Sequence, residues 1–163
     1  MITIVTAGRE DFCLIQKLAH QVWPVAYAAI LPEEQMKYML DAFYSENALI
    51  KSFDNGCQFV LVKEDETVLG FAGFEHFETK EQTKIHKLYL LPESQGKGIG
   101  KLLIEYIATK ATEKGFDKLI LNVNRFNKAL HFYEKLGFSI VEEIDIEIGK
   151  GYLMEDYVME KTL

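Results

Sequence analysis

Three glycines at alternate positions, Gly96, Gly98 and Gly100, lie between an apolar run and a helical pattern in the stretch PESQGKGIG. A glycine inside a regular element costs about 1 kcal/mol relative to alanine, so this spacing suggests that something approaches the chain closely. The start of a helix offers free backbone N–H groups and a partial positive charge, and it binds phosphate groups. Lys97 and Lys101 add positive charge beside it. The stretch therefore predicts a pyrophosphate site, and the alternative is a tight turn with close packing of the helix on a sheet.

Two other phosphate-binding signatures do not fit these residues. Counted from Gly96 or Gly98, the dinucleotide fingerprint GxGxxG would place its last glycine at Lys101 or Leu103. A Walker A loop requires Ser or Thr after its Gly-Lys pair, where this chain has Leu102. Both failures count against a nucleotide-binding α/β protein that uses the same helix start, which stays open as a hypothesis from another class.

The residues around this stretch resemble the GNAT superfamily of acyl-coenzyme A dependent N-acetyltransferases. The family's pattern of Gln, two residues, Gly, one residue and Gly appears as Gln95, Gly98 and Gly100 after KLYLLPES. A second family block, on the next predicted helix, appears as Ala129, Tyr133, Glu134, Lys135, Gly137 and Phe138. The two blocks occur in the family's order with a predicted strand between them, and the resemblance extends over nearly the whole chain.

The resemblance implies that acetyl-CoA is the acyl donor, and no metal is expected. Asn127 would contact the pantetheine arm, with Asn124 as the alternative, because the family's Asn more often stands seven residues before the Tyr, whereas Asn127 stands six before Tyr133. The main chain near Leu88, Leu90 and Leu91 would pair with this arm where the sheet splays at a bulge. The backbone that would hold the pyrophosphate comprises Gln95, Gly96, Lys97, Gly98, Ile99, Gly100 and Lys101.

Amide formation from a thioester requires a base for the protonated amine, a donor for the oxyanion and an acid for the leaving thiolate. The resemblance gives Tyr133 the role of the acid and a contact with the coenzyme; the alternative is a Tyr that only packs in the core. The backbone near Leu90 is the expected oxyanion donor.

The resemblance implies a base on the strand that leads into the glycine stretch, where His86 is the candidate and a structural histidine is the alternative. Alternation along that strand places Lys84, His86 and Leu88 on one face, and Ile85, Lys87 and Tyr89 on the other. Glu75 and His76, on opposite faces of the preceding strand, are rival candidates.

The resemblance implies an acceptor pocket around the first helices, where Trp23 and Tyr27 would form walls and Glu33 or Glu34 could attract a cationic amine. For each of these residues the alternative is core packing or a solvated helix start.

Composition limits the possible partners. The chain has 163 residues, 48% of them apolar and 26% charged, which is typical of a globular domain, and we expect a single GNAT-like domain over residues 1–163. The net charge of −7 argues against nucleic acid and favours a cationic partner. The first residues lack a secretory pattern and no apolar run could span a membrane, so we expect a cytoplasmic protein without a membrane partner. Cys13 and Cys57 are expected to be reduced and mostly buried.

The pattern predicts a mixed α/β fold. The family resemblance makes this a mostly antiparallel central sheet of six to seven strands, splayed in the middle, with helices on both faces. Pro24 is expected to end or bend the first helix, and the closing strands could pair with a second copy in a homodimer. The expected strands cover residues 2–5, 57–63, 67–77, 83–91, 118–123, 138–148 and 152–163, and the expected helices 10–23, a segment from 32, 45–53, a segment from 98, and 127–137.

These residues favour an N-acetyltransferase that moves the acetyl group of acetyl-CoA directly to a primary amine of a small molecule or a protein by general base and general acid catalysis. The alternative is a catalytically weak or inactive acyl-CoA-binding regulatory module.

Overall fold

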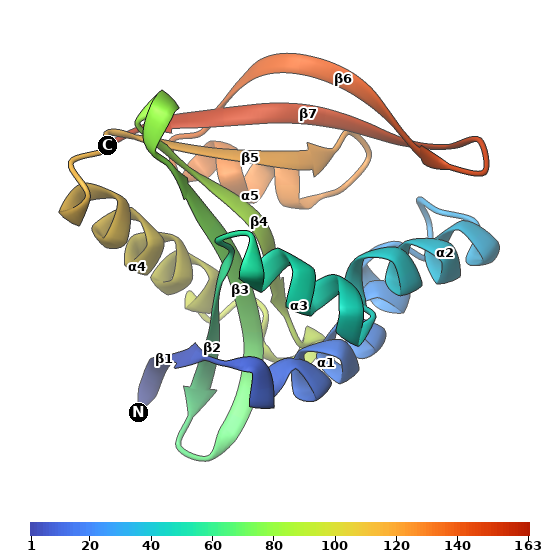
Figure 1. Cartoon of the computed structure of the whole chain (residues 1–163), viewed down its shortest axis with the longest axis horizontal. Coiled ribbons are helices and arrows are strands. Elements are labelled where there is room, and N and C mark those ends of the chain that lie inside the picture. Colours follow the sequence, from blue (N-terminus) through green and yellow to red (C-terminus); the bar gives the residue numbers. More distant parts are fainter.

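Seven strands form one sheet with helices on both faces in the computed structural model, which describes residues 1–163 (Figure 1). The strands are β1 (Ile2–Ala7), β2 (Gln58–Glu64), β3 (Thr67–Phe77), β4 (Gln82–Leu90), β5 (Lys118–Asn124), β6 (Ser139–Gly149) and β7 (Tyr152–Thr162). The helices are α1 (Phe12–Ala26), α2 (Glu33–Tyr44), α3 (Glu46–Asp54), α4 (Ile99–Glu113) and α5 (Ala129–Lys135). The predicted fold class is confirmed.

The sheet has the strand order β1-β2-β3-β4-β5-β7-β6, and only β4 and β5 are parallel. Those two strands pair only between Gln82–Ile85 and Lys118–Leu121. Beyond Ile85, β4 continues to Leu90 and β5 continues to Asn124 without pairing to each other. The sheet therefore splays into a V, with β1 to β4 on one arm and β5 to β7 on the other (Figure 1).

A register shift in the β3–β4 ladder lies just before this V. Gly73 pairs with Lys87, whereas the next residue, Phe74, pairs with Ile85, so His86 is the extra residue of a β-bulge. We expected the bulge nearer Leu88 to Leu91, and it lies earlier in the strand.

The bulge also overturns the predicted division of β4 into two faces. Ile85 and Leu88, expected on opposite faces, pack in the same core. One extra residue reverses the alternation of every residue after it, and a strict period of two cannot reveal that.

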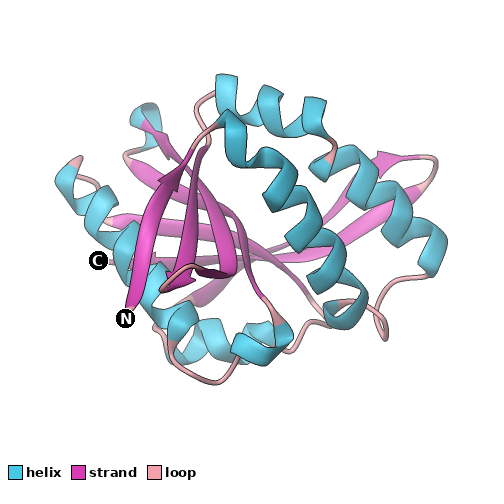
Figure 2. Ribbon diagram, turned by 90° about the horizontal axis from the view of Figure 1, so that it is seen from below, coloured by secondary structure: helices cyan, strands magenta, loops and turns pink.

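Two cores flank the sheet, and Figure 2 shows the strands between the two groups of helices. One core lies under α4 and α5 and includes Leu103, Ile107, Leu119 and Met159. The other lies under α1, α2 and α3 and includes Phe12, Ile15, Leu49, Phe59 and Phe71. None of the helices combines the length and the apolar character that crossing a membrane requires.

Two expectations about α1 need correction. The helix continues through Pro24 and ends at Ala26, so Pro24 does not terminate it. Cys13, in the first turn of α1, is exposed, whereas Cys57 is buried as expected. The burial of Cys57 raises the pKa of its thiol to about 12.

Candidate active site

The predicted phosphate site consists of a continuous row of free amides. In the loop before α4, Gln95 N–H donates to Pro92 O, and the next backbone bond is from Leu102 N–H to Gly98 O. The N–H groups of residues 96 to 101 have no backbone acceptor, because they precede or form the first turn of α4. This row, together with the positive end of a helix of 15 residues, suits an anion.

The three glycines of this loop serve two different purposes. Gly96 and Gly98 have φ values of +78° and +76°, and a Cβ added to either would meet nothing within 4 Å. Open space therefore lies beside both residues, as a diphosphate would require. A Cβ on Gly100 would lie 2.9 Å from Cζ of Phe132 on α5, so this glycine serves helix packing rather than ligand approach.

The main chain of β4 faces the V with polar groups that make no hydrogen bond to another strand. Leu91 N–H donates to Leu69 O, which directs the polar groups of alternate residues toward β3. The N–H and C=O groups of Leu88 and Leu90 consequently point away from β3 and into the V, where β5 no longer pairs with β4. Leu90 O lies 3.5 Å from Nε2 of Gln95. An extended ligand could pair with this strand edge from the row of free amides inward.

A cluster of buried tyrosines lies on the face of β4 that is turned toward α1, α2 and α3. The hydroxyls of Tyr27 and Tyr89 are 2.9 Å apart, and the Tyr27 ring lies 4.7 Å from Trp23. Trp23 and Tyr27 are only 4% and 8% exposed, so they belong to the α1 core as well as to any acceptor site. Tyr133 on α5 is 8% exposed, and its pKa is raised by burial and, to a lesser extent, by Tyr27. Its phenol therefore stays protonated at neutral pH.

The bulge residue His86 forms a pair with Glu75 of β3. Its Nε2 lies 3.0 Å from Oε1 of Glu75, and both side chains are partly exposed. Burial lowers the pKa of His86, while the hydrogen bond to Glu75 opposes this shift. The structure therefore joins two of the predicted base candidates into one unit. His76 lies apart from them, 2.7 Å from the Thr83 hydroxyl.

A pocket of about 230 Å³ opens where α2, the end of β5 and the β6–β7 hairpin meet. Gln35 of α2 donates from Nε2 to Leu153 O at 3.0 Å. A carbonyl can only accept, so this bond fixes the amide orientation and leaves Gln35 Oε1 free to accept. The pocket thus combines hydrogen-bond acceptors with an apolar wall. Its lining residues are Ile30, Leu31, Gln35, Asn124, Phe126, Gly151, Tyr152, Leu153 and Glu155.

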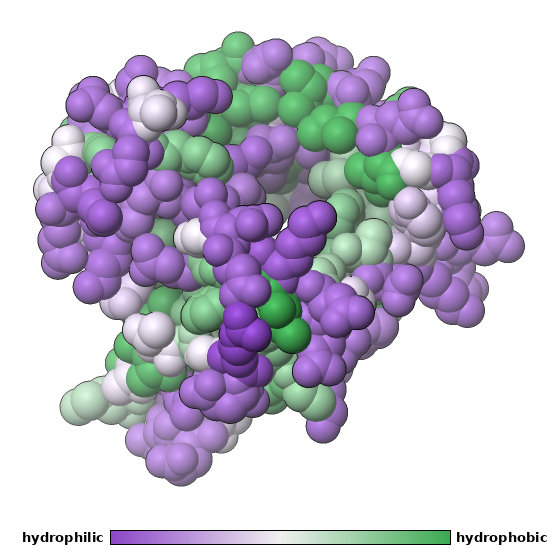
Figure 3. Space-filling view, in the orientation of Figure 1, coloured by the Kyte–Doolittle hydropathy of each residue, from purple (hydrophilic) through white to green (hydrophobic).

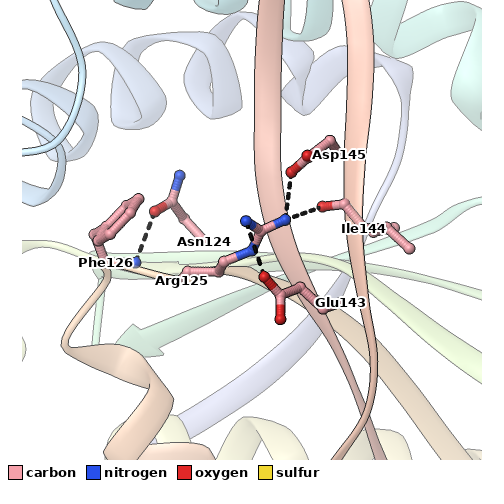
Figure 4. A network of polar contacts seen from close by, with 6 residues as sticks. All are labelled: Asn124, Arg125, Phe126, Glu143, Ile144 and Asp145. Atoms are coloured by element: carbon pink, nitrogen blue, oxygen red, sulfur yellow. Dashed lines mark hydrogen bonds and ion pairs between the residues drawn. The ribbon is translucent and has the colours of Figure 1, made fainter.

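Arg125 fixes the start of the loop after β5, directly after Asn124, the last residue of that strand (Figure 4). Its guanidinium reaches β6, where Nη1 lies 3.1 Å from Glu143 and Nη2 donates to Ile144 O at 2.8 Å and to Asp145. Its own N–H donates to Glu155 O of β7 at 3.0 Å. Arg125 thereby ties the end of β5 to β6 through its side chain and to β7 through its backbone N–H.

The two asparagine candidates have different local roles. Asn127 Oδ1 accepts from Ala129 N–H at 2.9 Å and so satisfies a free amide at the start of α5. Asn124 Oδ1 accepts from Phe126 N–H at 2.9 Å and its side chain lines the pocket. Asn124 thus lies on the pocket side, and Asn127 lies at the start of the helix that carries Tyr133.

Sequence reasoning missed Asp156 on β7. It is only 3% exposed, and burial raises its pKa, although Asn122, Arg125 and Lys84 act in the opposite direction. The sequence did contain a signal for it. Alternation along the strand places Asp156 on the same face as Met154, which packs against the core under α1, α2 and α3, so an acid stands where an apolar residue is expected.

Comparison with known proteins defines the class. Residues 16–138 match the family model of the acetyltransferase (GNAT) family. A spermidine N(1)-acetyltransferase from Thermoplasma acidophilum is 31% identical over 152 residues, covering 90% of this chain and 91% of that protein. The uncharacterized N-acetyltransferase YuaI from Bacillus subtilis is 26% identical over 160 residues, covering 95% and 90%.

A solved structure agrees with these matches. The PaiA N-acetyltransferase from Thermoplasma acidophilum, in complex with coenzyme A, has a TM-score of 0.83 and 28% identity and covers 100% of this chain and 99% of that chain. The protein is therefore an acyltransferase. It belongs to the GNAT family of N-acetyltransferases.

Proposed function

We propose that the protein transfers the acetyl group of acetyl-CoA to a primary amine of a small, positively charged molecule. The observation that carries this proposal is the row of free amides at residues 96 to 101, which leads to the unpaired edge of β4. The amides and the open side of Gly96 and Gly98 would hold the pyrophosphate. The main chain of Leu88 and Leu90 would pair with the pantetheine arm.

His86 is the proposed base for the acceptor. An alkylammonium must lose a proton before its nitrogen can attack a thioester. The His86–Glu75 pair is partly exposed, so a water molecule can carry this proton to the imidazole. Glu75 stabilises the resulting imidazolium across a hydrogen bond of 3.0 Å.

The remaining steps involve the backbone of β4 and Tyr133. When the C–N bond forms, the carbonyl oxygen becomes an oxyanion, and the N–H groups of Leu88 and Leu90 are the fixed donors that face it. When the C–S bond breaks, the Tyr133 phenol donates its proton to the thiolate and regains one from the ammonium nitrogen or from water. Burial keeps this phenol protonated until that moment.

The acceptor is proposed to enter through the pocket beside Gln35 and Asn124. Its volume of about 230 Å³ suits a short alkylamine, and Gln35 Oε1 and the Glu155 carboxylate offer acceptors to N–H groups. Phe126 and Tyr152 can face a cation or an alkyl chain. The spermidine acetyltransferase among the relatives and the net charge of −7 support a polyamine as the acceptor.

An acceptor screen tests the proposed function. Purified protein with acetyl-CoA is given a panel of polyamines, monoamines, amino acids and peptides, and free thiol is measured. We expect turnover with polyamines above the rate of hydrolysis without acceptor. Coenzyme binding without turnover on any amine would instead indicate the regulatory module, and the absence of coenzyme binding would overturn both functions.

A further inference from the structure

Asp156 places a carboxylate on the inner face of the second arm of the V. It pairs with Asn124 across the β5–β7 ladder, and paired residues share a face of the sheet. Asn124 lines the pocket that the acceptor is proposed to enter. Asp156 lies on the same face of β7 as Met154, which packs against the core under α1, α2 and α3, so it faces the space between the splayed sheet and the first helices. Tyr27, directly after α1, has its pKa raised in part by this carboxylate. In Figure 3 the surface is hollowed between β7 and the α2–α3 layer.

No cation of the protein makes an ion pair with this carboxylate. Arg125 is engaged with Glu143 and Asp145 on β6. Lys84 of β4 affects the pKa of Asp156 from a distance, but it does not approach within the 4.0 Å of an ion pair. Buried carboxylates in proteins are normally paired with a cation or a metal. This one is 3% exposed and has no such partner.

We propose that Asp156 receives the ammonium group of the acceptor at the open end of the β4–β5 splay and so makes the enzyme selective for positively charged amines. This inference rests on the proposed function. The ammonium group of the acceptor would be the ion-pair partner that Asp156 lacks within the protein. Asn124, which lines the pocket, would contact the acceptor on its way to Asp156.

The stability of an Asp156→Asn variant separates this role from a structural one. The pKa of Asp156 is raised in the folded protein, so its charge at neutral pH opposes folding, and the opposition fades as pH falls. Replacing the carboxylate by an amide of the same shape is therefore expected to leave the melting temperature at pH 7 unchanged or higher. A carboxylate retained for structure would give a lower one.

The decisive experiment compares two acceptors that differ in charge. The first is spermidine. The second is its aminooxy analogue, in which oxygen replaces the CH2 next to the reacting amine, so that this amino group is uncharged at neutral pH. We expect Asp156→Asn to lower kcat/KM for spermidine by about 30-fold or more, as for loss of one partner of a buried charge pair. The loss with the aminooxy analogue should be several times smaller.

Matched controls keep the outcomes distinct. Glu142→Gln removes an exposed acid of the neighbouring strand β6 and should change neither reaction. Equal losses on both acceptors, no loss on either, or a lowered melting temperature would overturn the role of Asp156 while the enzyme remained a transferase. If the wild-type protein acetylated no amine, the proposed function would fail and this inference with it.

Discussion

Tyr133 is the proposed acid for the leaving thiolate. It is buried at 8% exposure and contacts Phe138 at a ring distance of 5.8 Å. The same burial is what a packing residue would show, so position alone does not establish its role. Burial raises the pKa of this phenol, so its hydroxyl is protonated at neutral pH, as an acid for the thiolate must be.

Removal of that hydroxyl should therefore affect turnover and not binding. For Tyr133→Phe we expect kcat to fall about 100-fold or more, the range typical of a lost general acid. The affinity for coenzyme A, measured by calorimetry, should remain. Tyr106→Phe, on α4, is the matched control and should retain full activity. An unchanged kcat in Tyr133→Phe would assign this tyrosine to packing alone.

The His86–Glu75 pair gives a pH dependence with a definite sign. Burial lowers the pKa of His86, and Glu75 partly restores it. As the base must be neutral to accept a proton, kcat/KM should fall as pH drops through the pKa of His86. Glu75→Gln removes the restoring charge, so the acidic limb should move to lower pH. Glu78→Gln, whose carboxylate pairs with Lys114 on the surface, should leave the limb in place. A limb that Glu75→Gln does not move would assign the titration to another group.

At the scale of elements, two glycines at the start of α4 look alike in the sequence but have different roles in the structure. Gly98 has a left-handed φ of +76°, and the space beside it is open. The space where a side chain of Gly100 would lie is occupied by the ring of Phe132 on α5. The sequence predicted bare backbone at both positions. It could not show the difference, because Phe132 lies more than thirty residues further along the chain.

Two alanine variants should accordingly behave differently. Gly100→Ala should lower the free energy of unfolding by about 1–3 kcal/mol through overpacking, and adding Phe132→Leu should recover part of it. Gly98→Ala should cost about 1–2 kcal/mol for its left-handed backbone and should also weaken coenzyme A binding. Denaturant unfolding and calorimetry measure the two effects. A Gly100→Ala protein that Phe132→Leu did not improve would contradict this assignment.

The β4 strand shows that local sequence patterns predict where a strand lies but not which way its side chains face. A strand over residues 83–91 was predicted, and the structure has it at Gln82–Leu90. The faces of its side chains were predicted wrongly, because the bulge at His86 depends on the pairing with β3. Pairing between strands is a tertiary feature that alternation within one strand does not encode.

At the scale of the whole molecule, the order of elements predicted a mixed α/β fold, the family resemblance implied its splayed and mostly antiparallel sheet, and the glycine stretch predicted the free helix start. The acceptor pocket was not predictable in the same way. Its lining comes from the α1–α2 connection, the end of β5 and the β6–β7 hairpin, three regions that meet only because β7 inserts between β5 and β6. Trp23 and Tyr27 were expected to form walls of an acceptor pocket near the first helices, with core packing as the alternative, and they lie in the core under α1, α2 and α3 and not in the lining of this pocket.

The central claim is that the amides of residues 96 to 101 and the unpaired edge of β4 hold one extended donor. A crystal structure of the protein with coenzyme A bound tests it most directly. We expect the pyrophosphate within hydrogen-bond distance of those amides and the pantetheine arm along the main chain of Leu88 and Leu90, with the sulfur near the Tyr133 hydroxyl. Coenzyme bound elsewhere on the molecule, or with its pantetheine arm outside the V, would contradict the account.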